Sequence, residues 1–145
     1  MKLLSIYKAR VIEVIDGDTF KGEVDLGFDV RITRHFRVFG IDTPEIFRPK
    51  TDSERVRGIL AKDRASELLL DKEVEVKLHG TEKYGRALVE VILPDNRDYT
   101  NLMIQEGFSK IIHVFTQAYI AKYDFFISGC IKASLFFYHS RSFQL

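Results

Sequence analysis

Two pairs of acidic residues carry the first sign of chemistry in this sequence. Asp16 and Asp18 stand in the stretch IDGDTF, and Asp42 and Glu45 stand in the stretch GIDTPE. Each stretch follows a predicted strand, and the ends of two strands that flank a common neighbour can converge. Carboxylates gathered in this way repel one another unless a cation lies among them, and oxygen donors without His or Cys favour a hard ion, Ca²⁺ or Mg²⁺. The alternative is that each stretch only forms a turn.

A Thr43–Pro44 pair lies between the second pair of acids. Proline restricts the residue before it to an extended conformation, and this fixes the direction of the Thr43 carbonyl. A carbonyl held in one direction suits a backbone metal ligand, but a simple turn needs the same restriction. The Thr43–Pro44 pair therefore fits both interpretations.

Two arginines add to these features, and only the first of them stands close to the acids in sequence. Arg37 has the same strand parity as Phe39 and Ile41, so it is expected to share their face, and an arginine is rarely buried unless it is paired. Its partner is either the acid cluster or a phosphate. Arg86 follows Gly85, which allows a tight turn. Two guanidinium groups and a divalent cation around one site describe a phosphoryl-transfer centre, because their donors match phosphate oxygens and oppose the charge that develops there.

The elements that must position these side chains follow from the hydrophobic pattern. Alternating apolar residues predict strands, and Asp, Gly and Pro mark the turns between them. The predicted strands span residues 9–15, 20–26, 29–41, 74–78 and 86–93, and the predicted helices span residues 54–70 and 101–106. This order indicates an α+β fold that is mainly β: a five-stranded OB-fold barrel with about three packed helices, the third in the C-terminal stretch.

Bulk properties exclude several classes of protein. The 145 residues suit one domain, and 22 Lys and Arg against 21 Asp and Glu argue against a strongly basic nucleic-acid coat. The single Cys rules out an internal disulfide. No signal-peptide core and no membrane span are found, which predicts a cytoplasmic location and leaves secretion by another route open. We also expect a monomer.

The C-terminal stretch differs from the rest of the chain. From Phe115 onward, 31 residues carry four charged side chains, six of the 12 Phe and three of the six Tyr. We expect a C-terminal helix and extension that pack on the barrel. A patch for a partner or a membrane surface is the alternative, although scattered charges spoil a simple amphipathic face.

Four motifs together resemble the staphylococcal (micrococcal) nuclease, or thermonuclease, family. They are IDGDTF, FRVFGIDTPE, EKYGRALVEV and NLMIQEGFSK, in the family's order over roughly residues 9–115. The resemblance implies an OB-fold nuclease that uses Ca²⁺ to hydrolyse phosphodiester bonds in DNA and RNA. It also implies a nuclease-like domain over residues 1–115, followed by residues 116–145 as a divergent, aromatic-rich helix or tail of the same domain.

The resemblance assigns metal-binding and catalytic acids by motif. Asp18 and Asp42 resemble the carboxylate ligands of calcium, and Thr43 resembles the residue that offers its carbonyl oxygen. Glu45 resembles the acid that activates the attacking water, a role stated here as a hypothesis.

The resemblance also assigns residues that contact phosphate. Arg37 and Arg86 resemble the two arginines that clamp the reacting phosphate, and Lys83 and Tyr84 match residues that contact a substrate phosphate. The chain departs from the family at His113 and Phe115, where tyrosines are usual, and this departure bears on base contacts and substrate preference.

A rival hypothesis is a catalytically weak or inactive nuclease-like module that binds nucleic acid or protein. A metal-free OB barrel for sugars or proteins is more remote. The acid cluster favours the enzyme, because acids without a metal would repel phosphates. The retained set is Asp18, Arg37, Asp42, Glu45 and Arg86.

Overall fold

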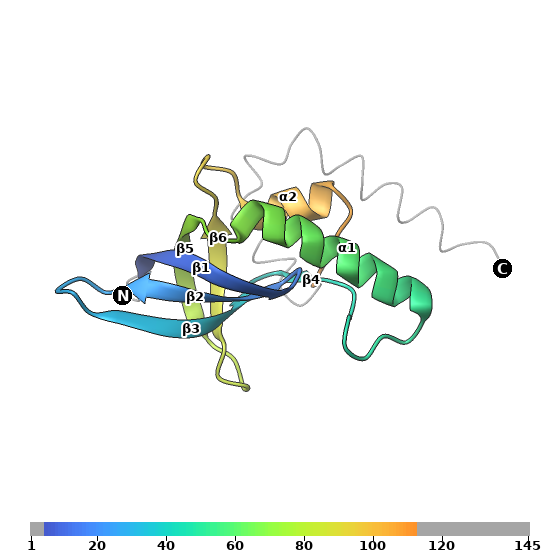
Figure 1. Cartoon of the computed structure of the whole chain (residues 1–145), viewed down its shortest axis with the longest axis horizontal. Coiled ribbons are helices and arrows are strands. Elements are labelled where there is room, and N and C mark those ends of the chain that lie inside the picture. The colour runs from blue at the N-terminus through green and yellow to red at the C-terminus, as the bar shows by residue number, and fades with distance from the viewer. Residues whose placement is uncertain (1–4, 113–145) are drawn as a thin grey trace. The chain divides into compact units, whose positions relative to one another are not determined.

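Five strands close into a barrel in the computed structural model, which describes residues 5–112 (Figure 1). The strands are β1 (Ile6–Asp16), β2 (Thr19–Asp25), β3 (Arg31–Val38), β5 (Glu73–Thr81) and β6 (Ala87–Ile92), in the order β1-β2-β3-β6-β5. Neighbouring strands are antiparallel except for the parallel pair β3 and β6. This arrangement confirms the predicted five-stranded OB-type barrel.

Two helices and a small second sheet complete the described part. Along the sequence, helix α1 (Asp52–Leu69) comes after the three-stranded meander and before β5, and α2 (Tyr99–Gln105) follows β6. Strand β4 (Ile41–Asp42) pairs with β7 (Lys110–Ile111) outside the barrel. The third predicted helix and the aromatic tail lie outside the described residues. Within residues 5–112, no helix is both long and apolar enough to cross a lipid bilayer.

The predicted long strand over residues 29–41 is wrong at its C-terminal end. Strand β3 stops at Val38, and Gly40 adopts a φ of 84° that turns the chain into β4. The face predicted for Arg37 is therefore wrong too, because strand parity does not continue through a turn. Phe36 and Val38 point into the core, and Arg37 between them points to the outside of the barrel.

The core fills the barrel and the space under α1. Its fully buried larger side chains are Tyr99, Phe20, Ile41, Leu69, Met103, Val11, Val38, Val74, Val76, Val89 and Val91. Helix α1 begins after Thr51, whose hydroxyl accepts a hydrogen bond from the Glu54 N–H at 3.1 Å. Its buried face includes Gly58, where an added Cβ would lie 2.7 Å from the Pro44 carbonyl oxygen. The helix can therefore approach the chain after β4 closely.

Candidate active site

Six of the eight side chains predicted for the site line one small pocket of about 90 Å³. They come from the β1–β2 turn, the end of β3, the chain from β4 onward and the residue before β6. The lining residues are Asp16, Asp18, Arg37, Asp42, Thr43, Pro44, Glu45 and Arg86. The barrel therefore gathers residues from four segments that are far apart in sequence.

Strand pairing explains how these segments meet. Thr19 at the start of β2 lies opposite Arg37 near the end of β3, so the β1–β2 turn lies beside that arginine. The parallel pairing of β3 with β6 places Arg37 beside Leu88, two residues after Arg86. Since Thr19, Arg37 and Leu88 lie in register across three strands, both arginines reach the same end of the barrel.

Asp18 is the most connected side chain of the pocket, and only 6% of its surface is exposed. One carboxylate oxygen accepts hydrogen bonds from the Thr43 N–H at 2.8 Å and the Thr43 hydroxyl at 3.0 Å. The other oxygen accepts one from the Thr19 hydroxyl at 3.0 Å. The guanidinium of Arg37 forms an ion pair with the same carboxylate. These contacts lock the β1–β2 turn to the chain after β4.

Asp16 and Asp18 have divergent proton affinities. Burial raises the pKa of Asp16 to about 7, together with a hydrogen bond to Asp18 and the negative charge of Asp18. Burial alone would raise the pKa of Asp18 as well, but the hydrogen bond with Asp16, the charge of Arg37 and the donors of Thr43 hold it below its usual value. Asp18 is therefore the anionic member of the pair.

Both arginines of the site are bound to carboxylates. Arg37 lies between Asp18 and Asp42, and its second terminal nitrogen is 3.0 Å from an Asp42 oxygen. Arg86 forms an ion pair with Glu82 and donates a hydrogen bond to the Thr19 hydroxyl at 3.2 Å. The sequence leaves two possible partners for Arg37, the acid cluster and a phosphate, and the structure pairs it with the acid cluster. A phosphate at this site would have to exchange with these carboxylates.

Lys83 and Tyr84 are the two predicted site residues that do not line the pocket. They lie on the loop between β5 and β6, where the Lys83 ammonium stands 4.8 Å from the centre of the Tyr84 ring. Tyr84 is 71% exposed. Both residues precede Arg86 by two or three positions, but neither side chain lines the pocket.

Three supporting residues were not predicted from the sequence. Glu82 and Thr19 bind Arg86, and Tyr99 donates a hydrogen bond from its hydroxyl to the Gly17 carbonyl at 2.6 Å. Only Glu82 had a signal in the sequence, since it lies four residues before Arg86 across a Gly-containing turn. Tyr99 joins the site from α2, which no local pattern connects with Gly17.

The donors of the pocket fit a hard cation. Asp18 and Asp42 are both bound to one guanidinium, which shows that a single positive group can serve the two carboxylates. In residues 5–112, no three His, Cys, Asp or Glu side chains are grouped closely enough to hold a metal alone. A cation bound by Asp18 and Asp42 would therefore need the Thr43 carbonyl and water as further oxygen ligands, a mixture that Ca²⁺ accepts.

The chain belongs to the family described as "Staphylococcal nuclease homologue", which matches residues 35–128. The matched range contains Arg37, Asp42, Glu45 and Arg86, whereas Asp18 lies before it. The association of Asp18 with the other residues therefore rests on the structure.

Two relatives carry the name "Uncharacterized endonuclease". One is from Escherichia coli O157:H7 and the other from Escherichia coli, and each is 32% identical to this chain over 98 residues. The aligned region covers 68% of this chain and 56% of each relative. The chain thus spans little more than half the length of these relatives.

Proposed function

We propose that this protein is a calcium-dependent nuclease that hydrolyses phosphodiester bonds of DNA, RNA or both. The observation that carries the proposal is the convergence of two arginines, two carboxylates and an exposed glutamate on one pocket. Family membership and the endonuclease name of the relatives support the same class of reaction. The pocket residues concerned are Asp18, Arg37, Asp42, Glu45 and Arg86.

The cation would be held by Asp18, Asp42 and the Thr43 carbonyl. When bound, Ca²⁺ supplies positive charge next to a phosphoryl oxygen and lowers the energy of the charged transition state. Asp18 suits this role because its pKa is held below its usual value, so it is anionic at neutral pH. The Thr43 N–H and hydroxyl hold the Asp18 carboxylate in one orientation.

Glu45 would act as the general base. Its side chain is exposed and lines the pocket, so its carboxylate can reach both solvent and a bound phosphodiester. Transfer of a proton from water to this carboxylate would create the nucleophile that attacks phosphorus. The position of Glu45 three residues after Asp42 keeps the base next to the proposed cation site.

Arg37 and Arg86 would neutralise the charge that develops on the phosphoryl oxygens. Each guanidinium is already held by carboxylates, so the groups are oriented before substrate arrives. Binding of phosphate requires each arginine to give up at least one donor to a phosphate oxygen. The planar guanidinium can do this while keeping a second hydrogen bond to its carboxylate.

The test is hydrolysis of single-stranded DNA by the whole chain with Ca²⁺, with a chelator, and with Glu45→Gln. We expect cleavage that the chelator abolishes and a loss of about 10²- to 10⁴-fold in rate for Glu45→Gln, as for removal of a general base. Asp63→Asn, an exposed acid on α1, serves as the matched control and should keep its rate.

Two outcomes would contradict the proposal. Cleavage that survives chelation, or that returns with Mg²⁺ but not with Ca²⁺, would refute the calcium assignment. A folded protein that binds DNA without cleaving it would support the rival hypothesis of an inactive nuclease-like binding module.

A further inference from the structure

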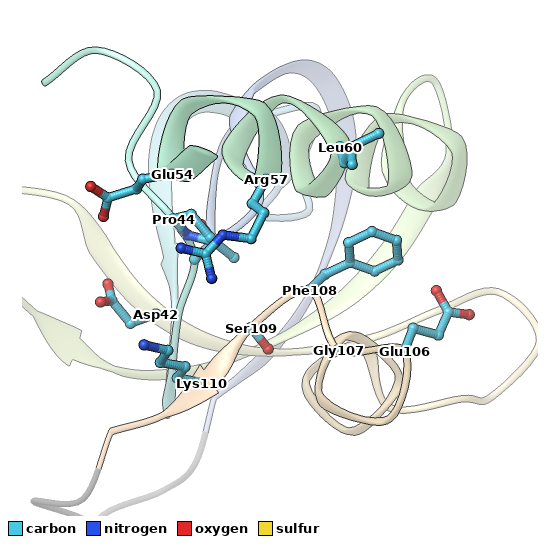
Figure 2. Close-up of a pocket in the computed structure, with 11 residues that line it drawn as sticks. Asp42, Pro44, Glu54, Arg57, Leu60, Glu106, Gly107, Phe108, Ser109 and Lys110 are labelled. Carbon is cyan, nitrogen blue, oxygen red and sulfur yellow. The ribbon is translucent and has the colours of Figure 1, made fainter. Parts of the chain in front are cut away.

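A second and larger pocket lies directly beside the candidate active site. It has a volume of about 310 Å³ and is formed by α1, by β4 with the residues after it, and by residues 106–110 (Figure 2). Asp42, Thr43 and Pro44 line both pockets and form the wall between them. A strand of nucleic acid that crosses the active site can therefore continue over this wall into the second pocket.

Two cations of the second pocket are not neutralised by acids. Arg57 and Lys110 line the pocket, and neither forms an ion pair among the described residues. Arg57 donates a long hydrogen bond of 3.4 Å to the Ser53 carbonyl. Figure 2 shows the Arg57 guanidinium directed toward the side of the pocket that holds Asp42 and Lys110. Both cations are thus available to an anionic group.

The acids that line the second pocket are each engaged elsewhere. Asp42 is paired with Arg37 at 3.0 Å, and Glu106 is paired with Arg64 at 2.7 Å. Glu54 accepts a hydrogen bond of 2.6 Å from a backbone N–H just before α1, where the helix dipole also favours its charge. Glu54 keeps its negative charge, because a backbone hydrogen bond does not neutralise a carboxylate. Among the described residues, Arg57 and Lys110 therefore exceed the unpaired acids of the pocket by one charge, which favours an anionic ligand.

The opposite end of the pocket is apolar. Leu60 is 52% exposed, and Phe108 is partly buried against the core. Figure 2 places both side chains at the end away from Asp42 and Lys110. The Ser109 hydroxyl on the pocket wall is buried and has no hydrogen-bond partner within residues 5–112.

We infer that this second pocket binds the nucleotide next to the scissile phosphate, with its phosphate on Arg57 and Lys110 and its base or sugar on Leu60 and Phe108. A cationic end and an aromatic, apolar end match the two parts of a nucleotide in single-stranded nucleic acid. The inference rests on the proposed nuclease function. It adds a binding site on the side of the wall away from Arg86 and the Lys83–Tyr84 loop.

The first test measures binding without cleavage. A fluorescently labelled single-stranded DNA hexamer is titrated with the Glu45→Gln protein in Ca²⁺, with and without the additional pair Arg57→Ala and Lys110→Ala. We expect binding to weaken about tenfold. The slope of the logarithm of the binding constant against the logarithm of the salt concentration should become shallower by about 0.7, the value for one lost phosphate contact on a single strand. The pair Arg55→Ala and Lys62→Ala removes the same charge from α1 outside the pocket and is the matched control.

The second test compares substrates of different length in the otherwise unchanged protein. A dinucleotide has only the scissile phosphate, whereas a hexamer also has neighbouring phosphates. The ratio of kcat/KM for the hexamer to that for the dinucleotide should fall about tenfold in the variant that lacks both cations. If the double variant does not fold, Arg57→Ala alone repeats both tests at an exposed helix position.

The outcomes separate the two proposals. If the wild-type chain cleaves DNA and the length ratio is unchanged in the variant, the subsite is refuted and the nuclease function stands. If the chain does not cleave but the variant loses hexamer affinity more than the control pair does, the nuclease function fails and the nucleotide site stands. Equal losses in the variant and its control would refute the subsite, because only general charge would then matter.

Discussion

The two neighbouring pockets differ in how their charges are satisfied. In the smaller pocket, Asp18, Arg37 and Arg86 already bind groups of the protein. In the larger pocket, Arg57 and Lys110 have no acidic partner in the described part of the chain. A ligand therefore enters the larger pocket by adding contacts, whereas it enters the smaller one by replacing contacts that exist.

This difference indicates that the smaller pocket holds its charged groups in a fixed orientation, whereas the larger pocket contributes to the affinity for a ligand. Groups that are held before the substrate arrives need little reorganisation during the reaction, which is what catalysis by charge stabilisation requires. Groups without partners add attraction to a polyanion but need not be oriented to the same degree. The comparison predicts that substitutions in the smaller pocket affect rate and stability, and that those in the larger pocket affect the binding of long substrates.

Arg37→Lys should give the largest effect. Lysine keeps the positive charge but cannot bind two carboxylates or a phosphate with a planar pair of donors, so we expect a loss of about 10²-fold in kcat. Steady-state cleavage of single-stranded DNA measures it. Arg57→Lys is the comparison, because a point charge is sufficient for a phosphate contact in the larger pocket. A similar loss for both variants would contradict the distinction between the pockets.

Tyr99→Phe should give the next largest effect, on stability. It removes the hydroxyl that binds the buried Gly17 carbonyl under the smaller pocket, and leaving that carbonyl unpaired should cost about 1–3 kcal/mol. Urea denaturation measures the free energy of unfolding. Arg57→Ala on the exposed surface of α1 should change it by less than about 0.5 kcal/mol. A stable Tyr99→Phe protein would show that the β1–β2 turn does not depend on this hydrogen bond.

Asp16→Asn should leave activity least affected, and its effect on stability should depend on pH. The pKa of Asp16 is raised from 3.8 to about 7 in the folded protein. The folded state therefore holds a proton that the unfolded state loses, and the stability from this difference is lost as pH rises from about 4 to about 7. Asparagine does not titrate, so the variant should gain stability relative to wild type over this range.

The measurement is urea denaturation of both proteins at pH 4.5 and pH 8 with a chelator present. With a pKa of 3.8 in the unfolded chain and about 7 in the folded protein, linkage gives a movement of up to about 3 kcal/mol in favour of Asp16→Asn at the higher pH. Asp63→Asn, which removes an exposed acid from α1, is measured beside it as the control. A difference that is constant with pH would mean that Asp16 does not keep its proton in the folded protein.

The barrel could be predicted because its signals are local. Alternating apolar residues and Asp, Gly and Pro turns identify strands one at a time, and five strands with a helix after the third fit few architectures. The end of β3 could not be placed in this way. Phe39 and Ile41 continue the apolar pattern through Gly40, so the pattern hides the turn that Gly40 makes.

The sequence predicts which residues belong to the candidate site, but not which side chains pair with one another there. Motifs identify Asp18, Arg37 and Arg86, and the structure brings them to one pocket. Their partners depend on distances of a few tenths of an ångström, which no sequence pattern encodes. Thus the pairing of Arg37 with Asp42 and of Arg86 with Glu82 emerged from the structure alone.

The larger pocket had no signal in the sequence. Its walls come from the chain after β4, from one face of α1 and from residues 106–110, and each part reads as ordinary surface. Leu60 is an exposed apolar residue that is not part of the buried face of α1. In three dimensions it is the apolar end of a pocket.

The parallel pairing of β3 with β6 has a consequence for local opening of the fold. It contains three residue pairs, whereas β1 and β2 share seven, so it is the shortest junction of the barrel. Arg37 lies on one side of this junction and Arg86 just beyond the other. A fluctuation that opened it would separate the two arginines while the β1-β2-β3 meander stayed paired. Amide exchange at Phe39, which donates to Val89 across this junction at 2.7 Å, would report how often the site comes apart.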